Sequence, residues 1–318
     1  MMAQLDPTRL SNPLWPTVVI LTFGAFVGAA IGNFVMINGT YAWVVVNHPG
    51  TLFYVAPRLA PKLGAIANFT MVAIPLWAVL GGWWAASLAA GRTGSVGVDL
   101  GVMLLSEGHP VCRRVNELAR ELALPPIKWV GWFEDDAINA FAVGTRRDNA
   151  LIAISRGAIE KLSNEQCDAV LAHELAHVAN NDMARMTYAR GVQEALTFFL
   201  LWRGFKNVAR WLFTPISQLE LMRFSRQREY WADAVAAVLT SPEAMIGALE
   251  AIHAAATKPP ASQKAYAGFM IRGNDRNLFA THPPADERIL ALRSRKYIER
   301  LPVVGAAPTP ASAPFLGS

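Results

Sequence analysis

The first ninety residues of the chain contain two long apolar runs. No Asp, Glu, Lys or Arg occurs from residue 10 to residue 57 or from residue 63 to residue 91. A helix needs about 20 apolar residues to cross the hydrocarbon core of a bilayer, and residues 16–37 and 66–90 both meet that length. The pattern therefore predicts that residues 1–90 form a membrane region with two transmembrane helices, joined by a loop that carries Arg58 and Lys62.

Glycines recur at every fourth position of the first run, at Gly24, Gly28 and Gly32. This spacing is typical of a helix face on which another helix packs closely. Ordinary glycine use in a membrane helix would give the same residues, so the sequence leaves both interpretations open.

Beyond residue 91 the pattern is that of a water-facing α+β domain. Residues 91–98 contain three glycines and are expected to form a loop. Apolar positions then recur at helical spacing from Val111 to Leu122, and two prolines at 125 and 126 end that helix. After residues 127–132, the segments 138–143 and 150–155 are expected to form two strands of a hairpin, with the turn at 144–149.

The next helix is predicted to begin near Asn164, because Ser163 and Gln166 have the spacing of a capping box. Its apolar face consists of Leu171, Leu175 and Val178. Further helices are expected at residues 226–240, 242–256 and 284–298. The order of helix, short sheet and helices predicts an α+β fold that is mainly helical, in a domain that covers residues 91–300.

Two segments of this second part follow other patterns. Residues 192–216 begin as an apolar run, but the basic residues at 203, 206 and 210 fall on one helical face. This favours an amphipathic helix in the membrane interface; a third membrane span and a soluble core helix are the alternatives. The tail, residues 301–318, is rich in Ala and Pro and is expected to be disordered.

The charge distribution adds an orientation to this picture. Hydrophobic residues make up 53% of the chain, charged residues 17%, and the net charge is +5. Basic residues in the N-terminal tail and after the second run favour a cytosolic N-terminus and main domain in a multi-pass protein of the cytoplasmic membrane. No basic-aromatic module typical of nucleic-acid binding is present, so attraction to anionic lipid head groups explains the positive charge more simply.

The stretch HELAHVANND, residues 173–182, carries the strongest chemical signal. Positions four apart on a helix lie one turn apart and about 40° from alignment, so His173 and His177 can share one metal ion. Glu174 is rotated by about 100° from His173 and can instead reach a water molecule that the metal activates. This combination is typical of zinc-dependent hydrolysis.

A catalytic zinc usually has three protein ligands and leaves one position for water. Glu229 and Asp233 lie four apart in SRQREYWADAVAA, residues 225–237, on a helix rich in small residues. Glu229 could be the third ligand, with Asp233 accepting a hydrogen bond from a ligand histidine. A salt-bridge network on the helix surface with Arg226 and Arg228 is the alternative, and spacing alone does not decide between them.

Taken together, the motifs resemble those of the HtpX-like membrane zinc metalloproteases, which are relatives of the CAAX prenyl endopeptidases. The resemblance rests on HELAHVANND and SRQREYWADAVAA, on THPPADERI at 281–289 and on NAFA at 139–142, and it spans about residues 15–300 in consistent order. The family commonly has two further hydrophobic segments between the histidine motif and the glutamate helix. In this chain that interval is short and broken by basic residues.

The resemblance implies a zincin-type metalloprotease domain with one Zn²⁺ per chain. It implies that His173, His177 and Glu229 are the zinc ligands, that Glu174 is the general base, and that Asp233 lies behind the metal. It implies that the strand at Asn139, Ala140 and Phe141 pairs with an extended substrate, that Asp182 is architectural, and that His282 and Arg288 help to stabilise the oxyanion. A purely structural role is the alternative for these last two.

These observations lead to the hypothesis of a membrane-anchored zinc endopeptidase. The family implies polypeptide substrates, above all membrane or misfolded proteins, in quality control. Two other hypotheses remain: a protease that processes one lipidated or membrane peptide, and a non-catalytic scaffold in which zinc holds helices together. The sequence does not indicate the oligomeric state.

Overall fold

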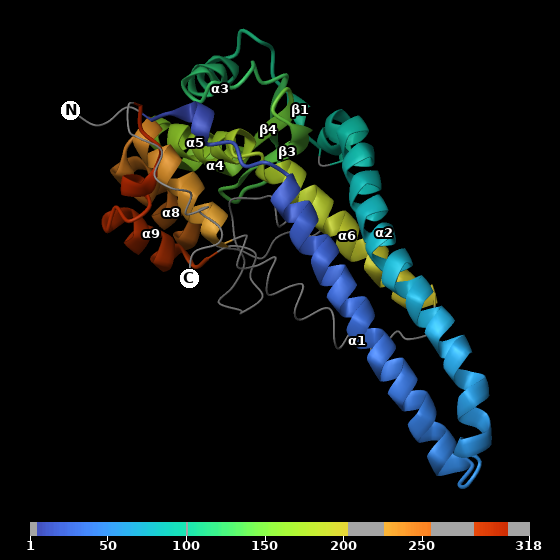
Figure 1. Ribbon diagram of the computed structural model, residues 1–318. Coiled ribbons are helices and arrows are strands. Elements are labelled where there is room, and N and C mark those ends of the chain that lie inside the picture. The colour runs from blue at the N-terminus through green and yellow to red at the C-terminus, as the bar shows by residue number, and fades with distance from the viewer. Residues whose placement is uncertain (1–4, 100, 203–225, 256–282, 305–318) are drawn as a thin grey trace. The chain divides into compact units, whose positions relative to one another are not determined.

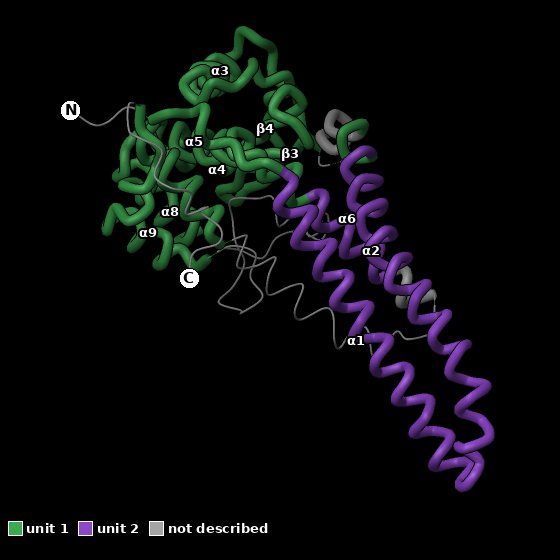
Figure 2. The backbone as a smooth tube through the Cα atoms, in the orientation of Figure 1, with its two compact units in different colours: residues 1–13, 88–186, 218–318 green, residues 14–87, 187–217 purple. Residues whose placement is uncertain are grey.

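The computed structural model describes residues 5–99, 101–202, 226–255 and 283–304, with the backbone alone for residues 92–99 and 198–202. The described part is mainly helical and has one four-stranded sheet (Figure 1). Clustering of contacts divides the chain into two compact units (Figure 2). The first contains residues 1–13, 88–186 and 218–318, and the second contains residues 14–87 and 187–217. The predicted α+β, mainly helical fold class is thus confirmed.

The expected membrane hairpin corresponds to two long helices, α1 (Trp15–Asn47) and α2 (Leu52–Asp99). Both are long and apolar enough to cross a membrane by length and composition. At 1.5 Å per residue, α1 is about 50 Å long, which exceeds the roughly 30 Å of a bilayer core. Large apolar side chains such as Phe23 and Phe34 lie on the surface of this unit, 66% and 69% exposed. Such exposure is costly in water and favourable against lipid.

The boundaries of α2 differ from the expectation. Arg58 and Lys62 do not lie in a loop, because α2 begins at Leu52 and only residues 48–51 separate the two helices. The predicted loop at 91–98 is also wrong, since α2 continues to Asp99. A helix satisfies its own backbone hydrogen bonds, and each glycine costs only about 1 kcal/mol relative to alanine. A long helix therefore accommodates several glycines that, taken as a short segment by themselves, would suggest a loop.

Close helix packing in the second unit uses other glycines than those expected. Gly28 is buried, but Gly24 and Gly32 are exposed, and a Cβ at either would contact nothing within 4 Å. The close approach instead involves α2 and α6 (Asp182–Trp202). A Cβ at Gly81 would lie 2.2 Å from the Cβ of Ala195. The backbones of these two helices are therefore nearly in contact.

The sheet belongs to the first unit and has the strand order β1-β2-β4-β3. Its strands are β1 (Met103–Leu104), β2 (Trp129–Phe133), β3 (Ala140–Arg146) and β4 (Asn149–Ser155). The predicted hairpin is confirmed as the antiparallel pair β3/β4, whereas β2 pairs with β4 in parallel. The two-residue strand β1 was not expected. Strand β3 lies at an edge of this sheet.

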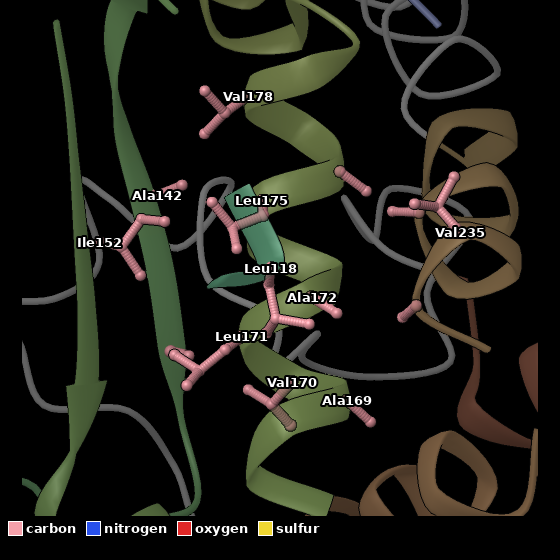
Figure 3. Close-up of a cluster of buried hydrophobic side chains, with 14 of the residues drawn as sticks. Leu118, Ala142, Ile152, Ala169, Val170, Leu171, Ala172, Leu175, Val178 and Val235 are labelled. Carbon is pink, nitrogen blue, oxygen red and sulfur yellow. The ribbon is translucent and has the colours of Figure 1, made fainter. Parts of the chain in front are cut away.

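Helix α5 (Asn164–Ala179) forms the centre of the core. The predicted capping box is present, with Ser163 and Gln166 each bonded to the other's backbone. Figure 3 shows α5 between the strand that carries Ala142 and the helix that carries Val235, which covers residues 226–239. Helices α3 (Pro110–Glu121) and α8 (Pro242–Ala254) also pack on α5. Because α5 is enclosed on these sides, every residue from Ala169 to Ala179 is buried.

The remaining elements correct two further expectations and leave one untested. Helix α4 covers Arg156–Lys161, and the helix expected at 284–298 is the shorter α9 (Ala285–Arg293), followed by the 3-10 turn Ile298–Arg300. The tail is ordered at its start: Leu301 is buried, and Val303 forms a β-bridge with Leu5. For the segment 192–216, helix α6 extends to Trp202, and the rest lies outside the described residues.

The core around α5 makes a prediction about stability. Leu118 of α3 is fully buried in it, so the Leu118→Ala substitution should lower the free energy of unfolding by about 2–5 kcal/mol. The thermal unfolding midpoint of the detergent-solubilised protein measures the effect. Leu290→Ala on α9, where the side chain is 68% exposed, is the control and should leave the midpoint unchanged. Equal shifts for the two variants would contradict this description of the core.

Candidate metal centre

Two helices of the core bring the candidate ligands together. His173, Glu174 and His177 lie on α5, and Glu229 and Asp233 lie on the neighbouring helix at 226–239. Small side chains permit the close approach of that helix, because its buried face toward the core consists largely of alanine. The alanines are Ala232, Ala234, Ala236 and Ala237.

The donor atoms of three of these residues surround one point. The Nε2 atoms of His173 and His177 are 3.2 Å apart, and the Glu229 carboxylate oxygens lie 3.5 Å and 3.6 Å from them. Metal–nitrogen bonds of 2.0–2.1 Å in a tetrahedral site place neighbouring donors roughly 3.3 Å apart. The spacing of His173, His177 and Glu229 therefore fits a single zinc ion, and two imidazoles with one carboxylate are a donor set that zinc prefers.

The second nitrogen of His173 faces a carboxylate that is itself held in place. Its Nδ1 lies 2.9 Å from Oδ1 of Asp233. The guanidinium of Arg288 on α9 donates from Nε and Nη2 to the two oxygens of Asp233, at 2.8 Å and 2.6 Å. This chain of contacts orients the imidazole so that Nε2 points toward the other ligands. The sequence expectation that Asp233 lies behind the cluster agrees with this geometry.

His177 has a corresponding partner on the opposite side. Its Nδ1 donates to Oδ2 of Asp182 at 3.0 Å. Asp182 is the first residue of α6 and is almost fully buried. Each histidine of the cluster thus has its own aspartate, and each aspartate fixes the ring so that Nε2 is available to a metal.

Burial and nearby charges shift the pKa of His173 and of Asp233 in opposite directions. Burial alone would lower the pKa of His173, but its hydrogen bonds to Asp233 and Glu229 outweigh burial and raise that pKa to about 9. Burial would raise the pKa of Asp233, yet the charge and hydrogen bonds of Arg288 keep it below the ordinary value. Asp233 is therefore ionised, as an acceptor for a ligand histidine must be.

Glu174 is buried beside the same cluster. Burial is the main cause that raises the pKa of its carboxyl to about 7. The charge of His173 opposes that shift, the charge of Glu229 adds to it, and the nearby backbone N–H of Ala142 lowers the pKa. A carboxyl with a pKa near neutrality is suited to accept and return a proton. Its contact with Ala142 places it next to the edge strand β3.

The side chains of the expected substrate-binding segment point away from any surface. Asn139, Ala140 and Phe141 are all buried, and Phe141 packs against Phe133 in a small apolar cluster on the sheet. Ser155 donates its backbone N–H to the carbonyl of Asn139 at 2.9 Å. This segment could therefore contact a ligand through its backbone and not through these three side chains.

The pairing of β3 and β4 shows which backbone groups face outward. Asn139 and Ser155 form a hydrogen-bonded pair, and such pairs alternate with pairs that do not bond each other. In the observed register Ala140 lies opposite Ile154 and Ala142 opposite Ile152. The N–H and C=O groups of Ala140 and Ala142 therefore face away from β4, although both residues are buried. The side-chain oxygen of Asn139 accepts the N–H of Ala140 at 3.0 Å.

Three further residues of the sequence motifs lie close to the cluster. Arg288 binds both oxygens of Asp233, which favours the structural one of the two roles that the sequence left open for it. Arg228 was expected on the surface as part of an alternative salt-bridge network, yet it is buried beside Glu229. Asp182 was assigned only an architectural role, and its position in the first turn after the histidine motif was the available signal. His282 lies outside the described residues.

Comparison with known proteins shows the family to which the chain belongs. The sequence profile of Peptidase family M48 matches residues 107–296, which include both helices of the cluster. The chain belongs to peptidase family M48. This confirms the resemblance to HtpX-like metalloproteases, and the M48 chain is accordingly a metalloprotease that carries two helices of membrane-spanning length.

The relatives of this M48 chain include bacterial proteins. It is 35% identical to Protease HtpX of Enterobacter sp. (strain 638) over 217 residues, which are 58% of this chain and 73% of the relative. It is 38% identical to Protease HtpX of Thioalkalivibrio sulfidiphilus over 205 residues, 57% of this chain and 69% of the relative. Among solved structures, S. mikatae Ste24p is 18% identical with a TM-score of 0.48, covering 88% of this chain and 66% of that one.

The cluster makes a prediction about metal binding. Glu229→Gln replaces a charged donor by a neutral amide, so the purified M48 protein should retain much less than one zinc per chain after dialysis, measured by atomic emission. Glu250→Gln is the matched control, because Glu250 forms an exposed ion pair with Arg293. An unchanged zinc content in Glu229→Gln would remove Glu229 from the ligand set.

Proposed function

We propose that this M48 protein is a membrane-anchored zinc endopeptidase in which His173, His177 and Glu229 hold one Zn²⁺. The observation that carries the proposal is the convergence of their donor atoms at 3.2–3.6 Å. A zinc ion bound there would acidify a water molecule and polarise the carbonyl to be attacked. The cluster contains three donors within the described residues, which leaves a fourth tetrahedral position for water or substrate and disfavours a purely structural zinc.

In this proposal Glu174 carries out both proton transfers, and the other charged residues keep the imidazoles in place. Glu174 takes the proton of the attacking water and returns it to the nitrogen of the departing amine. Its pKa of about 7 suits both directions of transfer at neutral pH. Asp233 and Asp182 keep the two imidazoles in the tautomer that donates from Nδ1. Arg288 keeps Asp233 ionised and thus contributes without touching substrate.

The edge strand β3 is the proposed binding site for the substrate backbone. The outward groups of Ala140 and Ala142 are two residues apart, the repeat at which an extended peptide presents its own groups on one side. Glu174 contacts Ala142, so a peptide paired with β3 would pass the general base. Without a peptide, the N–H of Ala140 donates to the side-chain oxygen of Asn139. A carbonyl of the bound peptide would replace that oxygen as the acceptor.

The proposed location is the cytoplasmic membrane, with the metal centre facing the cytosol. Two helices of membrane-spanning length and the basic residues that flank them support this placement. A protease held at a bilayer has preferential access to membrane polypeptides. We therefore propose quality control of membrane or misfolded proteins as the role; the names of the HtpX relatives support proteolysis as the activity.

The Glu174→Gln variant tests the mechanism. Without the general base, the rate of casein cleavage by the zinc-loaded protein should fall about 10²- to 10⁴-fold, while the zinc content stays at one per chain. Glu165→Gln, in the exposed first turn of the same helix, is the control and should cleave normally. Full activity in Glu174→Gln would rule out the proposed proton transfers.

The same inactive variant also tests the substrate class. Because it should bind polypeptides without cutting them, cross-linking in cells followed by mass spectrometry should recover a varied set of membrane proteins. Recovery of a single peptide would favour a dedicated processing protease instead.

The pairing with β3 predicts a pattern in substrate analogues. In a series of peptides that each carry one N-methylated residue, KM should rise about tenfold at alternate positions, because only every second N–H faces the strand. The intervening positions are the internal control. A uniform effect along the peptide would argue against recognition by strand pairing.

A further inference from the structure

Arg228 lies in the protein interior directly beside the donor cluster. Its side chain is only 4% exposed, and a buried guanidinium is stable only with charged or hydrogen-bonding partners. Consecutive helical residues point about 100° apart, so Arg228 and Glu229 do not share a helix face. The long side chain nevertheless turns back, and Nη2 donates to Oε1 of Glu229 at 3.2 Å.

The same guanidinium also faces the carboxylate that orients His177. Its Nε lies 3.7 Å from Oδ2 of Asp182, the oxygen that accepts from Nδ1 of His177 at 3.0 Å. His177 in turn lies 3.6 Å from Oε1 of Glu229 through Nε2. Arg228, Glu229, His177 and Asp182 therefore form a closed ring of contacts, in which Arg228 is the member that is not a metal ligand and not a direct partner of a ligand imidazole.

We infer that Arg228 is a positioning residue of the metal centre, which fixes the carboxylates of Glu229 and Asp182 in the geometry that zinc binding requires. The inference rests on the proposed zinc site. Neither the histidine motif nor the spacing of the candidate ligands assigns a role to Arg228.

Arg288 does not duplicate this function. It donates two hydrogen bonds to Asp233 on the His173 side, and its nearest approach to Glu229 is 4.0 Å, to Oε2. The two arginines thus approach different oxygens of Glu229, and of these two it is Arg228 that lies beside Asp182, the partner of His177. The buried Arg185 adds a further positive charge near Asp182. Loss of Arg228 would remove the hydrogen bond to Oε1 of Glu229 and the contact with the Asp182 carboxylate.

The sign of the effect separates positioning from simple electrostatics. A positive charge close to a bound cation repels it, so removing the charge without any positioning role would strengthen zinc binding. Loss of a group that orients ligands typically weakens metal binding 10- to 100-fold. The two explanations therefore predict opposite changes in the dissociation constant for zinc.

The experiment compares Arg228→Met and Arg228→Lys with wild type as full-length protein in detergent, using a chelator to compete for zinc. Both variants should bind zinc about 10- to 100-fold more weakly. Lysine keeps the charge but has no planar fork that can face two carboxylates at once, so it should not restore affinity. The cobalt(II) absorption spectrum should also change in both variants, because the orientation of Glu229 and His177 changes.

Arg226→Met is the control. Arg226 lies on the same helix but is not part of the ring of contacts formed by Arg228, Glu229, His177 and Asp182. The Arg226→Met protein should bind zinc as wild type does. Circular dichroism of the zinc-free proteins reports folding separately, and if Arg228→Met is unfolded, Arg228→Lys decides. Wild-type or tighter zinc binding in Arg228→Lys would overturn the inference. If wild type itself binds no zinc, the proposed function fails as well, whereas equal binding by wild type and variants overturns only the role of Arg228.

Discussion

The structure depends on how ionised side chains are accommodated inside an apolar core. Among the residues that the structure describes, four buried carboxylates, on Glu174, Asp182, Glu229 and Asp233, share the interior with three buried arginines at 185, 228 and 288. Isolated charges are very costly in such surroundings, and pairing offsets that cost only when the geometry is good. Besides the arginines, the raised pKa of His173 favours its protonated form, and a divalent cation bound between the imidazoles and Glu229 would take the place of that positive charge.

The fold meets this constraint by placing the charged groups on rigid elements. The candidate ligands come from two helices of one core, α5 and the helix at 226–239, and alanines allow these helices to lie close together. Groups that orient the ligands come from α6 and α9, which follow the histidine motif and the glutamate helix. The base faces the sheet edge. The two histidines are held in a fixed orientation by aspartates, and an edge strand lies next to them. This arrangement suits the hydrolysis of an extended polypeptide.

Local sequence patterns predicted those features that depend on neighbours in the chain. The capping box at Ser163, the β3/β4 hairpin and the helical spacing of His173 and His177 are of this kind, and Glu229 with Asp233 followed from helical spacing and family resemblance. Features that depend on distant contacts were not predictable. The bridge between Leu5 and Val303 joins the two ends of the chain. The burial of Arg228 beside Glu229 could not be predicted either, because helical spacing gives the direction of Cβ, whereas a long side chain can turn its end group toward another face.

The central claim is that His173, His177 and Glu229 hold one zinc ion with an open position. X-ray absorption spectroscopy of the purified, zinc-loaded protein tests it most directly. The account predicts only nitrogen and oxygen neighbours at about 2.0–2.2 Å, including two imidazoles, and an exchangeable oxygen in the fourth position. A sulfur neighbour at about 2.3 Å, a single imidazole, or a coordination sphere closed by four protein ligands would contradict it.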